Sequence, residues 1–244
     1  MPPENRPNNI ALDFYEKSYL SHGFSAQRKY PNEELARFMG RNLFGIAQTE
    51  RASHAVLEVG CGSGANLWMI AKEGFQTFGI DFSKESLNLA TKMLDSYNTR
   101  ADLRVADMSD LPFENAFFDT VVDVLGSCYL NQSDGIRFLH TVNRVLKKGG
   151  LFFSYFPSKS SDAFTNKGDS ELIDADTLSG ITRKDSPYAG CLYPHRFLHP
   201  RQYELLLRQC GFSVKTSESI TKTYNNRQEI FEMISIEAIK TDTI

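Results

Sequence analysis

The stretch that decides the fold is Leu57-Glu58-Val59-Gly60-Cys61-Gly62-Ser63-Gly64, and Gly79-Ile80-Asp81 closes the apolar run that follows it. Together they predict a strand, a glycine-rich turn, a helix beginning near Ala65, and a second strand with a carboxylate at its tip. The glycines lack side chains, so a ligand can approach the backbone and reach the N-terminus of the helix. The carboxylate can accept hydrogen bonds from two vicinal hydroxyls, such as those of a ribose.

Around this stretch, apolar strand-like runs alternate with segments of helical period from about residue 53 to residue 157. This alternation is typical of a parallel sheet covered by helices on both faces. We expect strands over 55–59, 77–80, 103–105, 120–125 and 151–156, and helices over 65–73, 83–96 and 133–146, the last two opened by Ser83 and Ser133. A helix over 200–210 ended by Gly211 and strands over 213–223 and 229–239 predict an antiparallel hairpin at one sheet edge.

Two regions flank this pattern. Helical periodicity in 11–20 and 32–44 predicts an N-terminal helical cap segment, residues 1–50, followed by a single α/β domain over residues 51–244. Within that domain, residues 157–195 show little periodicity, and so long an irregular segment is usually functional or mobile. We therefore expect residues 157–195 to form a lid that helps build a binding pocket.

Composition narrows the choice of partners. The 27 Lys and Arg against 30 Asp and Glu give a formal charge of -3, so no nucleic acid is expected as the main partner. No apolar run approaches the ~18 residues of a membrane span, and the polar N-terminus lacks the pattern of a secretory signal, which favours a cytoplasmic protein without a membrane anchor. Four scattered cysteines without a C-x-x-C pair are expected to stay reduced and bind no metal.

The glycine loop has two possible interpretations. Gly60 to Ala65 also fits the G-x-G-x-x-A pattern of dinucleotide-binding oxidoreductases, which is a weak signal taken alone. Two acidic positions favour another family: Glu58 lies two residues before the first glycine, and Asp107 follows the third strand. With E-V-G-C-G-S-G and G-I-D, these residues resemble the cofactor site of the class I S-adenosylmethionine-dependent methyltransferases.

The resemblance implies a Rossmann-like, doubly wound sheet of seven strands, ordered 3-2-1-4-5-7-6 with strand 7 antiparallel and helices on both faces. It implies S-adenosyl-L-methionine as cofactor, S-adenosyl-L-homocysteine as product, and roles for the matching residues. Gly60, Gly62 and Gly64 would line the methionyl part, Glu58 would orient the loop or the amino group, Asp81 would hold the ribose, Phe82 and Met108 would contact the adenine, Asp107 would accept from the adenine amino group, and Asp123 and Val124 would face the sulfonium.

Methyl transfer mainly requires alignment of the reacting atoms, and a general base is needed only where the acceptor must lose a proton. Our candidates for that base are His195 first, because imidazole titrates near neutrality, then His199, Asp123 and Tyr129. Alternatively, His195 is a surface or helix-entry residue, Tyr129 packs over the sheet edge, and Asp123 contacts the methionyl amine of the cofactor. Aromatic and basic side chains available for an acceptor pocket are Tyr15, Tyr19, Tyr30, Arg28, Arg183 and Arg196.

No Asn/Asp-Pro-Pro-Tyr/Phe motif follows the fourth strand and no Pro-Cys pair is present, which disfavours methylation of adenine, glutamine or cytosine C5. We therefore expect a small-molecule acceptor, methylated at oxygen or, second, at nitrogen. Alternatives are a protein or RNA methyltransferase, a non-catalytic cofactor-binding regulator and, more distantly, a dinucleotide oxidoreductase. The sequence leaves the oligomeric state open.

Overall fold

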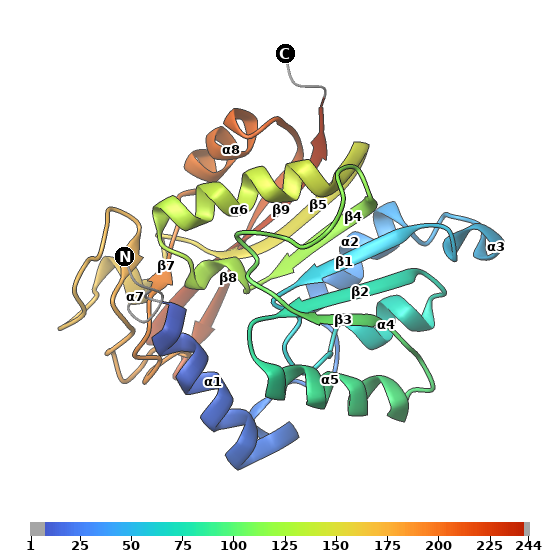
Figure 1. Cartoon of the computed structure of the whole chain (residues 1–244). Helices are drawn as coiled ribbons and strands as arrows, with labels where there is room; N and C mark the ends of the chain where they lie inside the picture. Colours follow the sequence, from blue (N-terminus) through green and yellow to red (C-terminus); the bar gives the residue numbers. More distant parts are fainter. Residues whose placement is uncertain (1–7, 242–244) are drawn as a thin grey trace.

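The computed structural model describes residues 8–241, and a seven-stranded sheet runs through its centre (Figure 1). The strands of this sheet are β1 (Ala55–Val59), β2 (Gln76–Asp81), β3 (Asp102–Val105), β4 (Phe118–Val124), β5 (Leu146–Pro157), β8 (Phe212–Tyr224) and β9 (Glu229–Lys240). They follow the order β3-β2-β1-β4-β5-β9-β8; β1 to β5 are parallel, and β9 is antiparallel to both neighbours. The predicted order and the reversed last strand are therefore confirmed.

Helices cover both faces of the sheet (Figure 1). Their bounds are α1 (Asn8–His22), η2 (Gly23–Ala26), α2 (Glu33–Asn42), α3 (Gln48–Arg51), α4 (Leu67–Lys72), α5 (Lys84–Ser96), η3 (Ser127–Tyr129), α6 (Gln132–Val145), α7 (Asp162–Thr165) and α8 (Pro200–Gln209). Successive side chains of a strand point to opposite faces, so Leu57 and Val121 pack with α6 and α8, whereas Val56 and Val122 pack with α2 and α4. Both faces of the central strands are thus buried.

The helix starts differ from the expected ones at two places. Ser83 caps α5 as predicted, because its side chain accepts a hydrogen bond from the backbone N–H of Ser86. The expected cap of α6 at Ser133 is wrong: Asn131 is the N-cap, and the Ser133 hydroxyl donates to the Asn131 side chain. Helix α4 begins at Leu67 rather than near residue 65, so the glycine loop is longer than the sequence pattern predicts.

The segment expected to be irregular is folded against the sheet. It holds the short helix α7 and the two-stranded pair of β6 (Thr177–Leu178) and β7 (His195–Arg196). Leu178, Ile181 and Tyr193 are buried there, so apolar packing orders this segment despite its lack of periodicity. We call residues 157–195 the lid segment from here on.

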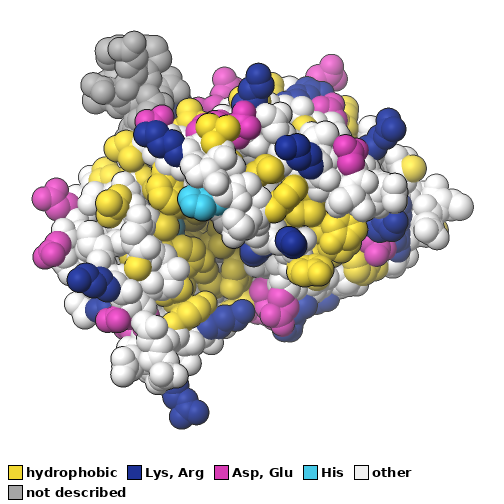
Figure 2. Space-filling model, turned by 90° about the horizontal axis from the view of Figure 1, so that it is seen from below, with side chains coloured by type: hydrophobic (Ala, Val, Ile, Leu, Met, Phe, Trp, Pro, Cys, Tyr) yellow, Lys and Arg dark blue, Asp and Glu magenta, His cyan; other side chains and the backbone are white. Residues whose placement is uncertain are grey.

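Residues 8–241 contain neither a membrane-spanning helix nor a metal-binding cluster. No helix there is both long and apolar enough to cross a lipid bilayer. In the same residues, no group of three or more His, Cys, Asp or Glu side chains is arranged to hold a metal ion. The surface seen from below in Figure 2 is hollowed over a band of hydrophobic side chains, with Lys and Arg side chains near it.

Candidate functional site

The glycine loop after β1 has a backbone that only glycine adopts readily. Gly60, Gly62 and Gly64 have φ values of 64°, 51° and 83°, all in the left-handed region. A Cβ on Gly60 would lie 3.0 Å from Cα of Gly126, in the loop after β4. The two loops therefore meet backbone to backbone at the carboxyl edge of the sheet, the edge where open α/β sheets bind ligands.

Asp81, at the end of β2, is joined to this loop. One carboxylate oxygen accepts a hydrogen bond from the Gly62 N–H at 2.8 Å, and the other accepts from the Ser83 N–H at 2.9 Å. Burial raises the pKa of Asp81, and these donors act against that rise. The structure thus brings Asp81 and the glycine loop together, as expected, and gives the carboxylate a second task in shaping the loop.

Glu58 presents an unsatisfied acceptor at the same place. Its side chain is buried, and Oε1 accepts from Nδ2 of Asn66 at 2.6 Å, whereas Oε2 has no hydrogen-bond partner among residues 8–241. Burial raises the pKa of this carboxyl to about 8. A buried carboxylate oxygen without a donor fits a ligand that brings its own cationic donor, such as an amino group.

Asn66 ties Glu58 to the N-terminal segment. Its amide oxygen accepts from the backbone N–H of Asn32 at 2.8 Å, and the Asn32 side chain in turn caps α2. We did not predict either asparagine from the sequence. Asn66 could have been noticed as a small polar residue at the end of the glycine loop. No local sequence feature marked Asn32 as part of the site.

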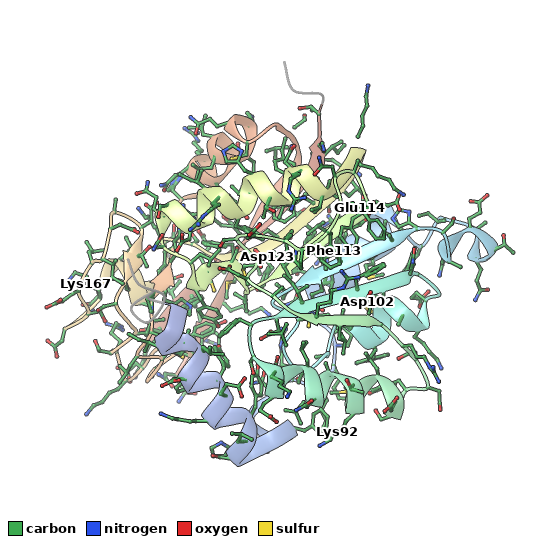
Figure 3. The ribbon with its side chains drawn as sticks, in the orientation of Figure 1. Lys92, Asp102, Phe113, Glu114, Asp123 and Lys167 are labelled. Carbon is green, nitrogen blue, oxygen red and sulfur yellow. The ribbon has the colours of Figure 1, made fainter. Side chains whose placement is uncertain are left out.

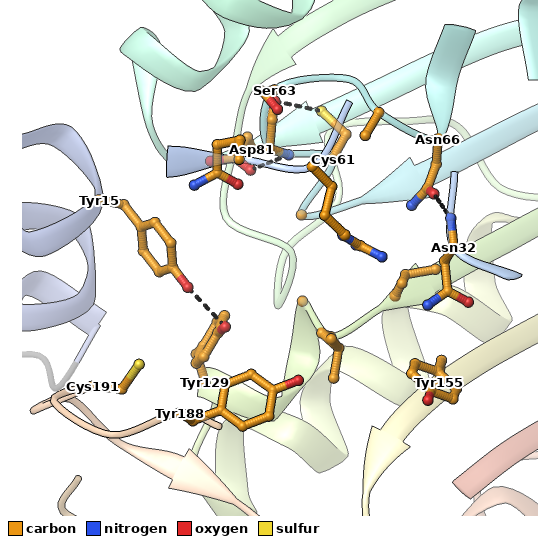
Figure 4. A pocket seen from close by; sticks show the side chains of 18 of the residues that line it. Tyr15, Asn32, Cys61, Ser63, Asn66, Asp81, Tyr129, Tyr155, Tyr188 and Cys191 are labelled. Atoms are coloured by element: carbon orange, nitrogen blue, oxygen red, sulfur yellow. Dashed lines mark hydrogen bonds between the residues drawn. The ribbon is translucent and has the colours of Figure 1, made fainter. Parts of the chain in front are cut away.

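These residues line a cavity of about 610 Å³ (Figure 4), within the range of small-molecule sites. Of the predicted site residues, those lining it are Glu58, Gly60, Gly62, Asp81, Phe82, Met108, Val124 and Tyr129. Additional lining residues that the sequence did not single out include Gly126, Tyr155, Tyr188, Lys222 and Phe231. They come from the loop after β4, from β5, from the lid segment and from the β8–β9 hairpin, which are far apart in the chain.

Three predicted cofactor residues, Gly64, Asp107 and Asp123, do not line the cavity. Gly64 faces α5: a Cβ there would lie 3.1 Å from both Cα and Cβ of Ala90, so this glycine permits close packing of the loop on the helix. Asp107 is not among the residues that line the cavity, and one of its oxygens accepts from the N–H and the hydroxyl of Ser109, both at 2.8 Å. Loop packing and turn formation explain the positions of Gly64 and Asp107.

Asp123 does not suit the role of general base. It is fully buried at the end of β4, and its oxygens accept from the N–H groups of Gly126 and Ser127 and from the hydroxyls of Ser127 and Ser154. In Figure 3, Asp123 lies in the middle of the molecule, whereas Lys92 and Lys167 lie at its edges. Burial raises the pKa of Asp123 against these four donors. The carboxylate holds the loop after β4 and does not line the cavity.

His195 is likewise removed from the cavity. The ring is fully buried behind Tyr129 and Tyr188, with ring centroids 5.2 and 5.4 Å away, and neither ring nitrogen has a partner among residues 8–241. Burial lowers the pKa of His195 to about 3, so the imidazole is neutral at physiological pH. Our first choice for the general base is therefore better described as part of an aromatic cluster.

Tyr129 does line the cavity, within a cluster of hydroxyls. Tyr15 of α1 donates to the Tyr129 hydroxyl at 2.8 Å, and its oxygen lies 3.0 Å from that of Tyr193 in the lid segment (Figure 4). Burial raises the pKa of Tyr129 well above its ordinary value, so the hydroxyl stays protonated. Helix α1 and the lid segment thus meet over the cavity through these three tyrosines.

The expected arginines separate into two groups. Arg28 lines the cavity, whereas Arg183 pairs with the buried Glu229 and Arg196 lies 3.8 Å from Asp176, away from the cavity. His199 is exposed at the start of α8. Of the expected aromatic walls, Tyr15 and Tyr19 line the cavity, and Tyr30 is exposed and does not line it.

Comparison with known proteins agrees with this geometry. Residues 56–150 match the model of a family described as a methyltransferase domain. The sterol 24-C-methyltransferase of Saccharomyces cerevisiae is 28% identical over 219 residues, which are 87% of this chain and 53% of that protein. The demethylmenaquinone methyltransferase of Symbiobacterium thermophilum is 30% identical over 186 residues, 68% of this chain and 72% of the relative. An 18S rRNA (guanine-N7)-methyltransferase of Saccharomyces cerevisiae is 31% identical over 118 residues, 44% of this chain and 42% of that one.

A solved structure extends the likeness to the whole fold. An S-adenosylmethionine-dependent methyltransferase from Clostridium acetobutylicum superposes with a TM-score of 0.63 at 16% identity, covering 97% of this chain and 100% of that one. The chain spans about half the length of the first curated relatives it matches. It belongs to the class I S-adenosylmethionine-dependent methyltransferases, whose cofactor is S-adenosylmethionine.

Proposed function

We propose that this protein transfers a methyl group from S-adenosylmethionine to an oxygen atom of a small molecule, with nitrogen as the second choice of acceptor atom. The observation that carries the proposal is the buried, unpartnered Oε2 of Glu58, which lines the same cavity as the glycine loop and Asp81. An acceptor of this kind suits an amino group of the cofactor, and the rest of the cavity is left for a second molecule.

The cofactor-side residues have distinct tasks in this proposal. Glu58 would hold the amino group, Gly60 and Gly62 would let the ligand approach the backbone, and Asp81 would accept from ribose hydroxyls. Phe82 and Met108 would flank the adenine. When bound, the cofactor supplies a methyl group on a positively charged sulfur, so the chain's main contribution is to align the acceptor, an effect that can reach about 7–11 kcal/mol.

A small-molecule acceptor is favoured by how the cavity is enclosed. Helix α1 and the lid segment meet over it through Tyr15, Tyr129 and Tyr193, and the β8–β9 hairpin adds Lys222 and Phe231 to its wall. Such a cover excludes water from the reacting groups. The rRNA methyltransferase among the relatives keeps RNA as the alternative acceptor, which the formal charge of -3 does not favour.

The test is calorimetric titration of the protein with S-adenosylmethionine, S-adenosylhomocysteine and NAD in parallel. We expect micromolar binding of the two sulfur compounds and none of NAD. Asp81→Ala should weaken both by at least tenfold; affinity near that of the unaltered protein would refute the assignment of the ribose contact. Binding of NAD alone would return the chain to the oxidoreductases, and binding without turnover of any acceptor would favour a regulatory protein.

A further inference from the structure

The part of the cavity away from the glycine loop has an aromatic wall, which we call the aromatic half. Its members are Tyr129, Tyr155, Tyr188, Tyr193, Tyr224 and Phe231. Neighbouring rings in this wall contact one another: the Tyr188 and Phe231 centroids are 4.9 Å apart, and those of Tyr129 and Tyr193 are 5.2 Å apart. Flat, rigid walls of this kind suit a planar, largely apolar ligand.

The aromatic half carries a positive charge. Lys222 of β8 lines it, pairs in the β ladder with Phe231 of β9, and forms no salt bridge with any carboxylate of residues 8–241. Arg28 also lines the cavity, and its charge lowers the pKa values of Glu58, Tyr155 and Tyr188. Among the described residues that line the cavity, the carboxylates are Glu58 and Asp81, both at the glycine loop. A cationic acceptor is therefore disfavoured beside Lys222, and an anionic one is favoured.

The hydroxyls of this wall are donors. Burial raises the pKa of Tyr155 to about 12 and that of Tyr188 further, so both stay protonated at neutral pH. A protonated hydroxyl donates a strong hydrogen bond to an ionised oxygen. The wall therefore combines planarity, one ammonium group and several hydroxyl donors.

Among residues 8–241, the aromatic half also lacks a group able to remove a proton. His195 and Asp123 do not line the cavity, and Asp123 already accepts four hydrogen bonds. The tyrosines are held in their protonated form, as described above. An acceptor methylated here must therefore bind with an atom that is already nucleophilic, and the positive charge of Lys222 favours an anionic oxygen over an amine.

We propose that the acceptor is a planar aromatic acid, held through its carboxylate by Lys222 and methylated on that ionised oxygen. This inference rests on the proposed function. A lone pair of the carboxylate oxygen forms the new bond to the methyl carbon, the carbon–sulfur bond breaks with its electron pair going to sulfur, and the products are a methyl ester and S-adenosylhomocysteine. No proton is gained or lost, so no base is required.

The experiment is calorimetric titration of the protein saturated with S-adenosylhomocysteine, using three probes of one shape: cinnamate, cinnamamide and cinnamylamine. We expect cinnamate to bind at least tenfold more tightly than cinnamamide, and cinnamylamine to bind most weakly. Lys222→Gln should remove most of the preference for cinnamate. Lys184→Gln, a matched loss of charge at an exposed lysine that does not line the cavity, should leave the preference unchanged.

The outcomes separate this inference from the proposed function. Failure of S-adenosylhomocysteine itself to bind would refute the proposed function. If it binds and cinnamamide or cinnamylamine equals cinnamate, or if Lys222→Gln keeps the preference, the assignment of an aromatic acid is overturned and the methyltransferase proposal stands. With cinnamate or a related acid as substrate and with S-adenosylmethionine at saturation, so that Glu58 is paired with the cofactor, the rate should be flat between about pH 6 and pH 9, because such carboxylates are fully ionised there; a rise with a midpoint in that range would show that an enzyme base takes part.

Discussion

The substitution Glu58→Gln separates two effects of this carboxyl: the stability that is lost by burying its charge, and the affinity that it gives to cofactor binding. The carboxyl is buried, one oxygen accepts from Asn66 at 2.6 Å and the other has no partner among residues 8–241. Gln keeps the size of the side chain and an oxygen for the Asn66 donor. It removes the charge that burial disfavours and that, in our proposal, binds the amino group of the cofactor.

The stability effect follows from the pKa of Glu58. Burial raises it from an ordinary value of 4.5 to about 8, so folding takes up a proton at pH values between these two. The unliganded protein must therefore lose stability as pH rises through this window, by up to about 1.4 kcal/mol per pH unit. Between pH 5 and pH 7.5 this amounts to roughly 3 kcal/mol, which the Gln variant does not lose.

The binding effect has the opposite sign. A hydrogen bond to a charged group contributes about 1.5–3 kcal/mol, so Glu58→Gln should weaken S-adenosylhomocysteine binding by roughly 10- to 100-fold. Urea unfolding at several pH values measures the first effect and calorimetry the second. Glu114→Gln, at an exposed glutamate outside the cavity, is the matched control. A variant that binds the ligand like the unaltered protein, or whose stability falls with pH in parallel with it, would refute the reasoning.

Three further predictions follow from residues around the site. His195→Phe should raise the unfolding free energy by about 1 kcal/mol at pH 7, because two unpartnered nitrogens leave the core. Since the pKa of His195 is lowered from 6.5 to about 3, folding releases a proton between these values, and the advantage of the variant should grow as pH falls through that window; urea unfolding with no such growth would contradict the burial argument. Asp123→Asn should cost about 2–4 kcal/mol of stability, because four donors lose a charged acceptor, and a thermal melt unchanged from the parent would oppose its assignment to the loop after β4. Gly135→Ala should cost about 1–3 kcal/mol, because its Cβ would overlap the guanidinium of the buried Arg196, whereas Gly40→Ala, with its nearest neighbour atom 3.9 Å away, should be neutral or stabilising; equal effects in urea unfolding would count against the lid packing.

The sheet and the glycine loop were predictable because their signals are local. Strand β1 was expected over residues 55–59 and occurs there, because a short, mostly apolar run that ends at a glycine is typical of a buried strand. Gly60 and Gly62 need a left-handed backbone wherever the loop lies, and Asp81 follows its strand directly. Cap positions such as Asn131 were missed because Asn131 and Ser133 are both suitable caps, and their hydrogen bonds decide between them.

The side chains proposed for catalysis depended on information that no short stretch contains. The sequence favoured His195 over Tyr129 as the general base, but aromatic packing buries the imidazole behind Tyr129 and leaves Tyr129 at the cavity. Asp123 lies at the predicted strand end, yet its donors come from Ser127, four residues on, and from Ser154 on the neighbouring strand. Burial and hydrogen-bond partners of this kind arise from contacts between distant segments.

By itself, the sequence determined the parallel sheet, the reversed last strand and the glycine loop with its two acidic strand ends, because backbone conformation and strand periodicity are properties of neighbouring residues. Only the tertiary structure decided what faces the cavity. The lid segment, α1 and the β8–β9 hairpin bring Tyr188, Tyr15 and Lys222 to one cavity from positions far apart in the chain. Packing decides which of these side chains stay exposed to water, which are buried, and which have a shifted pKa. The aromatic half of the cavity is therefore a property of the folded chain.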